Sequence, residues 1–244
     1  FYVWVRRSMG PFPGFMFAWL SWLYSIVDAA LYPLLFATYL SKFVELWTGH
    51  PVSSLEQGGV AMLVIVAMTL VNIKGITAVG RAATILTILI VTPFLFMVLA
   101  AGISIPHLDP IKLTPGALSV GLAAAMWNYL GWDNLSTVAG EVENPQKSFP
   151  RSLAISIPMV TLVYLLPVLA ALKTSPKAEQ GEEGSWAAIA TRASSPWIGG
   201  LVLLAALAAT SAMFASQMLA SSRIPAVLAE DGYLPVGLSK VSER

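Results

Sequence analysis

Long apolar stretches constrain the fold of this chain more than any motif does. Of its 244 residues, 57% are hydrophobic and 11% are charged, whereas a soluble domain has roughly 25% charged residues. A membrane-spanning helix needs about 20 mostly apolar residues. Six stretches reach or approach this length: 14–40, 59–73, 82–103, 116–140, 153–172 and 197–221. We therefore predict an all-α integral membrane protein with a single transmembrane domain over residues 1–244.

The fourth stretch, 116–140, is interrupted near its middle. Polar residues, a glycine and three aromatic side chains replace the apolar run between Trp127 and Asn134. A carboxylate at this depth, Asp133, is costly unless it faces the protein interior or a water-filled cavity, and irregular backbone is tolerated there on the same condition. We therefore predict a helix that breaks near 129–133, as the discontinuous helices of transporters do around a binding site.

The residues around this break form the predicted binding site. Unwound backbone has free amide and carbonyl groups that can face a substrate, and the aromatic rings can enclose its apolar or cationic part. The predicted substrate-binding residues are Trp127, Asn128, Tyr129, Leu130, Gly131 and Trp132. Packing or anchoring at the membrane interface is the alternative role for each ring.

Asp133 and Asp28 are the two carboxylates that fall inside the predicted spans. We predict that Asp133 gates the site or carries a proton, because a carboxylate in a partly dehydrated cavity takes up a proton readily. Its alternative role is to cap the helix that resumes at Asn134. Asp28 has two alternative roles. It could take part in gating or proton coupling, or it could form a hydrogen bond that fixes helix packing or relieves the backbone near Pro33.

Positive charges alternate between the loops and predict the orientation. Nine of the 14 Lys and Arg residues fall on one side: Arg6, Arg7, Lys74, Arg81, Lys147, Arg151, Arg223, Lys240 and Arg244. By the positive-inside rule this side is cytoplasmic. On the other side, the polar loop 175–195 is expected to include a short surface helix at 186–192. Hydroxyl and amide residues in the last span, Thr210, Ser211, Ser216 and Gln217, indicate helix packing, with an ion site as the alternative.

Several classes of function lack their residues here. The chain has no cysteine, so it has no disulfide and no thiolate metal site. We find no nucleophile–base pair, phosphate loop or metal-ligand cluster, and no clustered basic face for nucleic acid. We expect no enzyme, no cofactor and no nucleic-acid partner; the expected partners are a small-molecule substrate and the lipid bilayer.

Several motifs resemble one known family. Ala139-Gly-Glu-Val-Glu-Asn-Pro145, followed by Phe149-Pro-Arg151, is similar to the loop after the sixth helix of amino acid–polyamine–organocation (APC) transporters, and 127–136 is similar to their broken sixth helix. The segment from Val27 to Phe36 resembles the third helix of the plant polyamine and L-type-like amino acid permease branch. Further matches are Val71-Asn-Ile-Lys-Gly75 and Gly232-Tyr-Leu-Pro235, in the expected order along the chain.

This resemblance implies a five-plus-five inverted-repeat fold, of which the sequence would be a fragment with about the third to eighth helices. It implies a secondary active transporter for amino acids or polyamines that works by alternating access in a plasma or inner membrane. A proton is the expected coupling ion. Sodium is its alternative, because 82–103 lacks the lysine that some proton-coupled members have. An exchanger of the same fold and a non-transporting receptor-like or scaffold homologue are the alternative functions.

Overall fold

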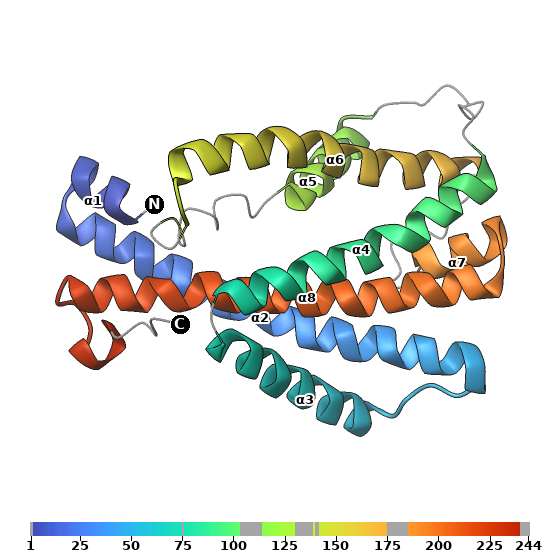
Figure 1. Cartoon of the computed structure of the whole chain (residues 1–244), viewed down its shortest axis with the longest axis horizontal. Coiled ribbons are helices and arrows are strands. Elements are labelled where there is room, and N and C mark those ends of the chain that lie inside the picture. Colours follow the sequence, from blue (N-terminus) through green and yellow to red (C-terminus); the bar gives the residue numbers. More distant parts are fainter. Residues whose placement is uncertain are drawn as a thin grey trace.

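The computed structural model describes residues 2–74, 76–102, 114–129, 139, 142–174 and 185–239. Every regular element in these ranges is a helix, which confirms the predicted all-α class (Figure 1). The elements are α1 (Tyr2–Met9), α2 (Pro11–Thr48), α3 (Ser54–Ile73), α4 (Ile76–Ala101), α5 (Pro115–Asn128), α6 (Pro145–Thr174), α7 (Ser185–Ala193), α8 (Pro196–Glu230) and the 3-10 helix η2 (Val236–Ser239).

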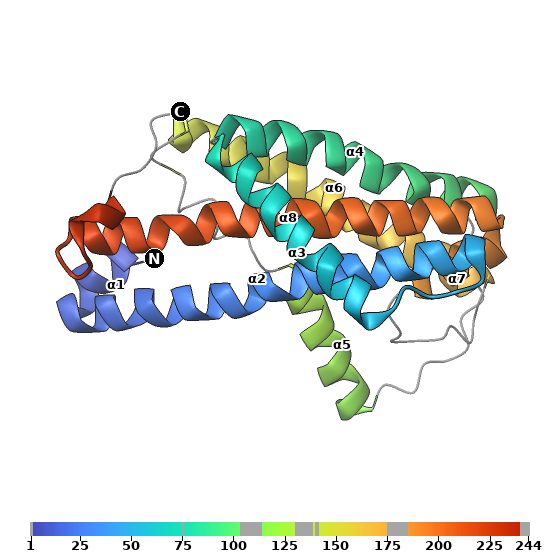
Figure 2. The ribbon, with the colours of Figure 1, turned by 90° about the horizontal axis from the view of Figure 1, so that it is seen from below.

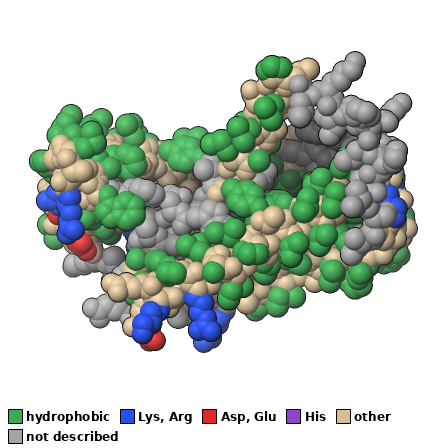
Figure 3. Space-filling view, turned by 90° about the horizontal axis from the view of Figure 1, so that it is seen from above, with side chains coloured by type: hydrophobic (Ala, Val, Ile, Leu, Met, Phe, Trp, Pro, Cys, Tyr) green, Lys and Arg blue, Asp and Glu red, His purple; other side chains and the backbone are tan. Residues whose placement is uncertain are grey.

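In the part of the chain that the structure describes, five helices are long and apolar enough to cross a membrane: α2, α3, Val79–Ala101 within α4, Pro145–Lys173 within α6, and α8. Figure 3 shows apolar side chains over most of one face, with charged side chains at its margins. Such a surface suits a protein embedded in lipid. The predicted span 116–140 begins with α5 and continues outside the described residues, so its extent stays a prediction.

Local signals set the ends of the long helices. α2 has 38 residues, about 57 Å at 1.5 Å per residue, so it extends past the predicted span 14–40 and past a hydrocarbon core about 30 Å thick. The helix is capped by Gly49, whose φ of +74° lies in the left-handed region that glycine adopts without strain. α3 begins with a capping box, in which the Ser53 side chain accepts from the Glu56 amide and Glu56 accepts from the Ser53 amide.

α8 is the central helix of the described chain. It packs against α2, α4, α7 and α3 (Figures 1 and 2). Half of the residues in its most apolar 18-residue stretch are buried, against 17% or less in the corresponding stretches of the other four spans. Small residues line its contacts, which lets neighbouring backbones approach closely. At Gly199 an added Cβ would lie 2.8 Å from the Ala187 carbonyl oxygen and 2.0 Å from Thr191 Oγ1. Glycine is therefore required where α7 crosses α8.

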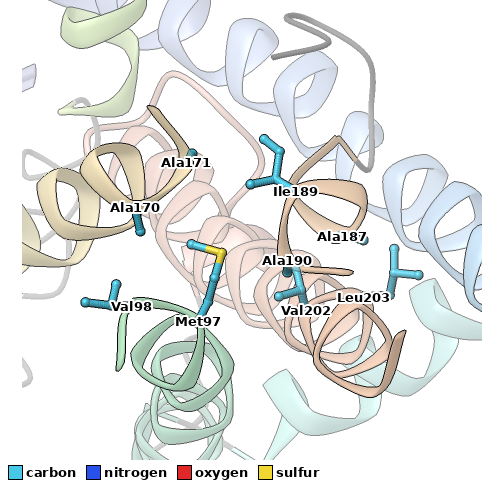
Figure 4. Packing of buried hydrophobic residues seen from close by; sticks show 9 residues of the cluster. All are labelled: Met97, Val98, Ala170, Ala171, Ala187, Ile189, Ala190, Val202 and Leu203. Carbon is cyan, nitrogen blue, oxygen red and sulfur yellow. The ribbon is translucent and has the colours of Figure 1, made fainter. Parts of the chain in front are cut away.

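The main hydrophobic cluster joins four helices at the predicted non-cytoplasmic end (Figure 4). Its members are Met97 and Val98 of α4, Ala170 and Ala171 of α6, Ala187, Ile189 and Ala190 of α7, and Val202 and Leu203 of α8. Met97 is fully buried in the middle of the cluster. A long, unbranched side chain such as methionine fills irregular gaps of this kind between helices.

The helix expected at 186–192 forms as α7, and one face of it is buried against the core. Three of its residues are buried in the cluster, and Trp186 packs edge-on against Phe94 of α4 with ring centroids 5.8 Å apart. The local sequence is short and of mixed polarity, so it indicates a helix without showing that its small residues face α8. The close approach at Gly199 brings this face into the core.

At the opposite end, α1 and the end of α8 form a charged corner. The chain turns sharply at Gly10, where φ is +99°, and α1 folds back so closely that a Cβ on Gly14 would lie 2.9 Å from the Arg6 Cα. Arg6 forms an ion pair with Asp231, and the Tyr2 hydroxyl donates to the same carboxylate. The corner thus joins two segments that are 229 residues apart in the sequence.

The hydrogen bond from Tyr2, helped by the Arg6 charge, lowers the pKa of the Asp231 carboxyl. Burial, together with this carboxylate, raises the pKa of Tyr2 to about 12. Because the Asp231 pKa is lower in the folded state, the corner stabilises the fold above the ordinary carboxyl pKa. This stability is lost as the pH falls through the lowered value.

We expect Asp231→Asn to cause a small decrease in the thermal unfolding temperature of the full-length protein at pH 7, because the exposed pair is partly screened by solvent. The difference from wild type should begin to shrink below about pH 4, where the carboxyl of the unfolded chain becomes protonated, and should continue to shrink as the pH falls toward the lowered pKa of the folded carboxyl. Thermal unfolding from pH 3 to 8 measures this. Glu230→Gln, which removes the neighbouring exposed charge, is the control; a difference that does not change with pH would contradict the assignment.

We expect Gly199→Ala to destabilise the protein by about 1–3 kcal/mol, as overpacking of a tight contact does. The Thr191 side chain can rotate away, but the Ala187 carbonyl cannot. Gly58→Ala on α3 is the matched control, because nothing lies within 4 Å of its added Cβ and alanine favours a helix by about 0.5–1 kcal/mol. Thermal unfolding of both variants checks the contrast, and equal effects would refute the close α7–α8 contact.

Candidate functional site

α5 leads into the predicted binding site. The helix ends at Asn128, and Tyr129 follows in a turn, with its amide donating to the Met126 carbonyl at 3.1 Å. Trp127 and Asn128 belong to the last turn of α5, but their side chains lie outside the described part of the structure. Leu130, Gly131, Trp132 and Asp133 also lie outside it, so the predicted break and the role of Asp133 stay predictions.

The side chain of Tyr129 joins α5 to α6. Its hydroxyl oxygen lies 2.8 Å from Thr161 Oγ1, and its ring centroid is 6.1 Å from that of Tyr164. Thr161 and Tyr164 are three residues apart and therefore share one face of α6. Both lie between Pro158 and Pro167, two of the three prolines inside this helix. The first described residue after α5 is thus held by a defined pair of contacts.

Sequence reasoning did not single out Thr161 or Tyr164. The signal available was a threonine followed three residues later by a tyrosine, in a helix interrupted by prolines. Threonine in a membrane helix usually bonds its own backbone, and Thr161 does donate to the Ile157 carbonyl at 2.9 Å. The second contact, to Tyr129, depends on where the end of α5 lies relative to α6 and cannot be read from the local pattern.

Asp28 lies partly buried in the middle of α2. The hydroxyl of Tyr32, one turn further along, donates to Asp28 Oδ2 at 3.1 Å. The pair precedes Pro33, whose ring leaves the Ala29 carbonyl without its helical hydrogen bond. The observed partner is a side chain of the same helix. Among the described contacts Asp28 is bonded by Tyr32, and Tyr129 lies against Thr161 of α6.

Two of the hydroxyl residues singled out in the last span bond the backbone of their own helix. Thr210 donates to the carbonyls of Ala206 and Leu207 at 3.0 and 3.1 Å, and Ser211 donates to Leu207 at 2.8 Å. Each hydroxyl proton is therefore bonded within the helix.

No group of three or more metal-ligating side chains occurs among the described residues.

Two further polar features lie away from the predicted site. Asn72 of α3 donates to the Ala215 carbonyl of α8 at 3.2 Å, which ties these two helices together. An open groove of about 400 Å³ lies between α2, α7 and α8, at the end of the molecule that holds α7. It is lined by Lys42, Glu45, Leu46, Ala187, Ala188, Thr191, Arg192 and Leu203. Neither feature involves the residues around the predicted break.

Comparison with known proteins adds to this geometry. The family model described as amino acid permease matches residues 1–244. The chain is 36% identical, over 240 residues, to the polyamine transporter PUT1 of Oryza sativa subsp. japonica. This alignment covers 96% of the chain and 44% of PUT1. It is 34% identical over 248 residues to a probable polyamine transporter of Arabidopsis thaliana, covering 98% of the chain and 48% of that protein.

A bacterial relative is more distant. The branched-chain amino acid permease BcaP of Bacillus subtilis (strain 168) is 26% identical over 188 residues, covering 75% of the chain and 40% of BcaP. The chain spans about half the length of the curated relatives it matches. These relatives are named as transporters and permeases, in agreement with the expectation that the chain is not an enzyme. Since the family model covers the whole chain and its helices suit a membrane, this chain belongs to the amino acid permease family.

Proposed function

We propose that the protein to which this chain belongs is a secondary active transporter that moves amino acids or polyamines across a membrane by alternating access. The main support is the 33–36% identity to proteins named polyamine transporters over at least 96% of the chain. The end of α5 at Asn128, next to the predicted break, is consistent with a discontinuous helix at the substrate site.

Within this proposal, cationic polyamines are the first substrate class. A polyamine has no carboxylate and needs counter-ions or hydrogen-bond acceptors, and Asp28 and Asp133 are the carboxylates within the predicted spans. The similarity to BcaP, a branched-chain amino acid permease, favours a neutral amino acid as the second candidate substrate. In that case the two aspartates serve gating or helix structure instead of charge recognition.

The proposed coupling ion is a proton, with sodium and substrate exchange as alternatives. Asp133 would carry the proton at the break while the helices around the site rock between outward-open and inward-open states. The proposed location is a cell membrane, plasma or inner, with the cytoplasmic side at the loops rich in Lys and Arg. In Figure 1 the starts of α2 and α6 and the end of α8 lie toward one end of the molecule, which is consistent with this orientation.

Uptake by proteoliposomes that contain the full-length protein tests the proposal. Labelled putrescine, arginine and leucine are compared with and without an inward proton gradient. Gradient-driven putrescine uptake supports a polyamine–proton symporter, and leucine uptake alone supports an amino acid permease. Uptake that depends on substrate preloaded on the opposite side indicates an exchanger. Binding without any flux would refute transport and favour the receptor-like alternative.

Substitutions of the two aspartates should affect uptake differently in this assay. We expect Asp133→Asn to abolish gradient-driven uptake or to make it independent of pH. Asp28→Asn should reduce putrescine uptake about tenfold, on the scale of one charged hydrogen bond, with less effect on leucine. Tyr32→Phe keeps the Asp28 charge and removes the bond from Tyr32, so its effect should be smaller. Glu230→Gln serves as the exposed control, and unchanged uptake and pH profile in Asp133→Asn would contradict its role.

A further inference from the structure

Tyr129 is the one predicted substrate-binding residue whose side chain the structure describes. Its hydroxyl oxygen lies 2.8 Å from Thr161 Oγ1, and Thr161 Oγ1 in turn lies 2.9 Å from the Ile157 carbonyl oxygen. These three oxygens form a chain from the end of α5 to the backbone of α6. The direction of the hydrogen bonds in this chain decides what Tyr129 can offer to a ligand.

The direction follows from counting protons. A threonine hydroxyl has one proton and two lone pairs, and a backbone carbonyl only accepts. Both contacts of Thr161 are satisfied together only if Thr161 donates to Ile157 and accepts from Tyr129. The single proton of the Tyr129 phenol is then used. Its oxygen has acceptor lone pairs left and no proton with which to bind an acceptor.

We propose that Tyr129 is a specificity-determining residue whose hydroxyl, oriented by Thr161, accepts a hydrogen bond from a substrate ammonium group. An ammonium group has three donors and no acceptor, whereas a carboxylate only accepts. The oriented oxygen therefore favours an amine and opposes a carboxylate at this position. A hydrogen bond with one charged partner is roughly twice as strong as a neutral one. This inference rests on the proposed function and narrows the part of the substrate that meets Tyr129.

The surroundings hold the tyrosine and leave it accessible. The Tyr164 ring lies beside the Tyr129 ring, and both residues that contact Tyr129 come from the same face of α6. Tyr129 is nevertheless 38% exposed, so its contacts with α6 leave part of the side chain free for a ligand. It also directly precedes the predicted break, where unwound backbone would face the substrate.

The test uses purified full-length protein and whichever of putrescine, arginine or leucine is transported. Inhibition constants are measured for that substrate and for its analogue in which a hydroxyl replaces one ammonium. For putrescine the analogue is 4-amino-1-butanol, and for leucine the 2-hydroxy acid. The ratio of the two constants reports how strongly the site prefers an ammonium, independently of the overall rate of uptake.

Three variants change the oriented hydroxyl in different ways. Tyr129→Phe removes it and should weaken binding of the amine at least about tenfold. Thr161→Val frees the Tyr129 proton, so the preference ratio should fall by about tenfold while the analogue is still bound. Thr161→Ser keeps the hydroxyl that accepts from Tyr129 and should therefore keep the wild-type ratio. The control is Thr92→Val on α4, which loses the same kind of bond to its own helix, from Thr92 to the Ile88 carbonyl at 2.7 Å.

Unchanged ratios in Tyr129→Phe and Thr161→Val would overturn the inference and leave transport standing. If wild type neither binds nor transports any of the three substrates, the proposed function itself fails and the inference falls with it. Thermal unfolding identifies a variant that is misfolded. In that event Thr161→Ser decides, since a ratio below wild type in this folded variant would contradict the acceptor role.

Discussion

Close packing around α8 is the interaction on which the rest of the structure depends. In a lipid environment the hydrophobic effect does not drive helices together, so contacts between well-fitted surfaces must do so. Glycine and alanine along α8 let α2, α4 and α7 approach it closely, and Gly199 leaves no room for a Cβ at the crossing with α7. The same helix carries Asp231 at its end, so it also anchors the charged corner with α1.

Besides this packing, a few polar contacts fix the positions of groups that packing alone does not hold. Most hydroxyl groups in the spans donate to a carbonyl of their own helix, which satisfies them without linking helices, as Thr87 and Thr92 do. Asn72 and Tyr129 reach a second helix, and Asp28 is bonded by a tyrosine on its own helix. Unpaired polar groups are costly in apolar surroundings, so these contacts hold their groups in set directions. At Tyr129 this direction has a consequence for the ligand, because the bonded hydroxyl offers an acceptor.

The fold was more accessible from sequence than the site. Apolar length, the Ser53–Glu56 capping box and the glycine at 49 are local signals, and the helices form where these signals indicate. The position of α7 was not accessible, because its polarity pattern does not show which face meets α8. For the site, the break near 129–133 stays a prediction, because Leu130 to Asp133 lie outside the described residues. Thr161 was missed because its second hydrogen bond comes from a residue 32 positions away.

The sequence by itself determined the membrane class, the all-helical fold, the family and the segment where a binding site is expected. These depend on composition, on runs of apolar residues and on short motifs, all of which are local properties of the chain. Tertiary structure alone decided that α8 is central, that one face of α7 is buried, that Asp231 meets Arg6 and Tyr2, and that the Tyr129 hydroxyl meets Thr161. Each of these depends on the distance and direction between two groups far apart in the sequence, which only the packing of the helices defines.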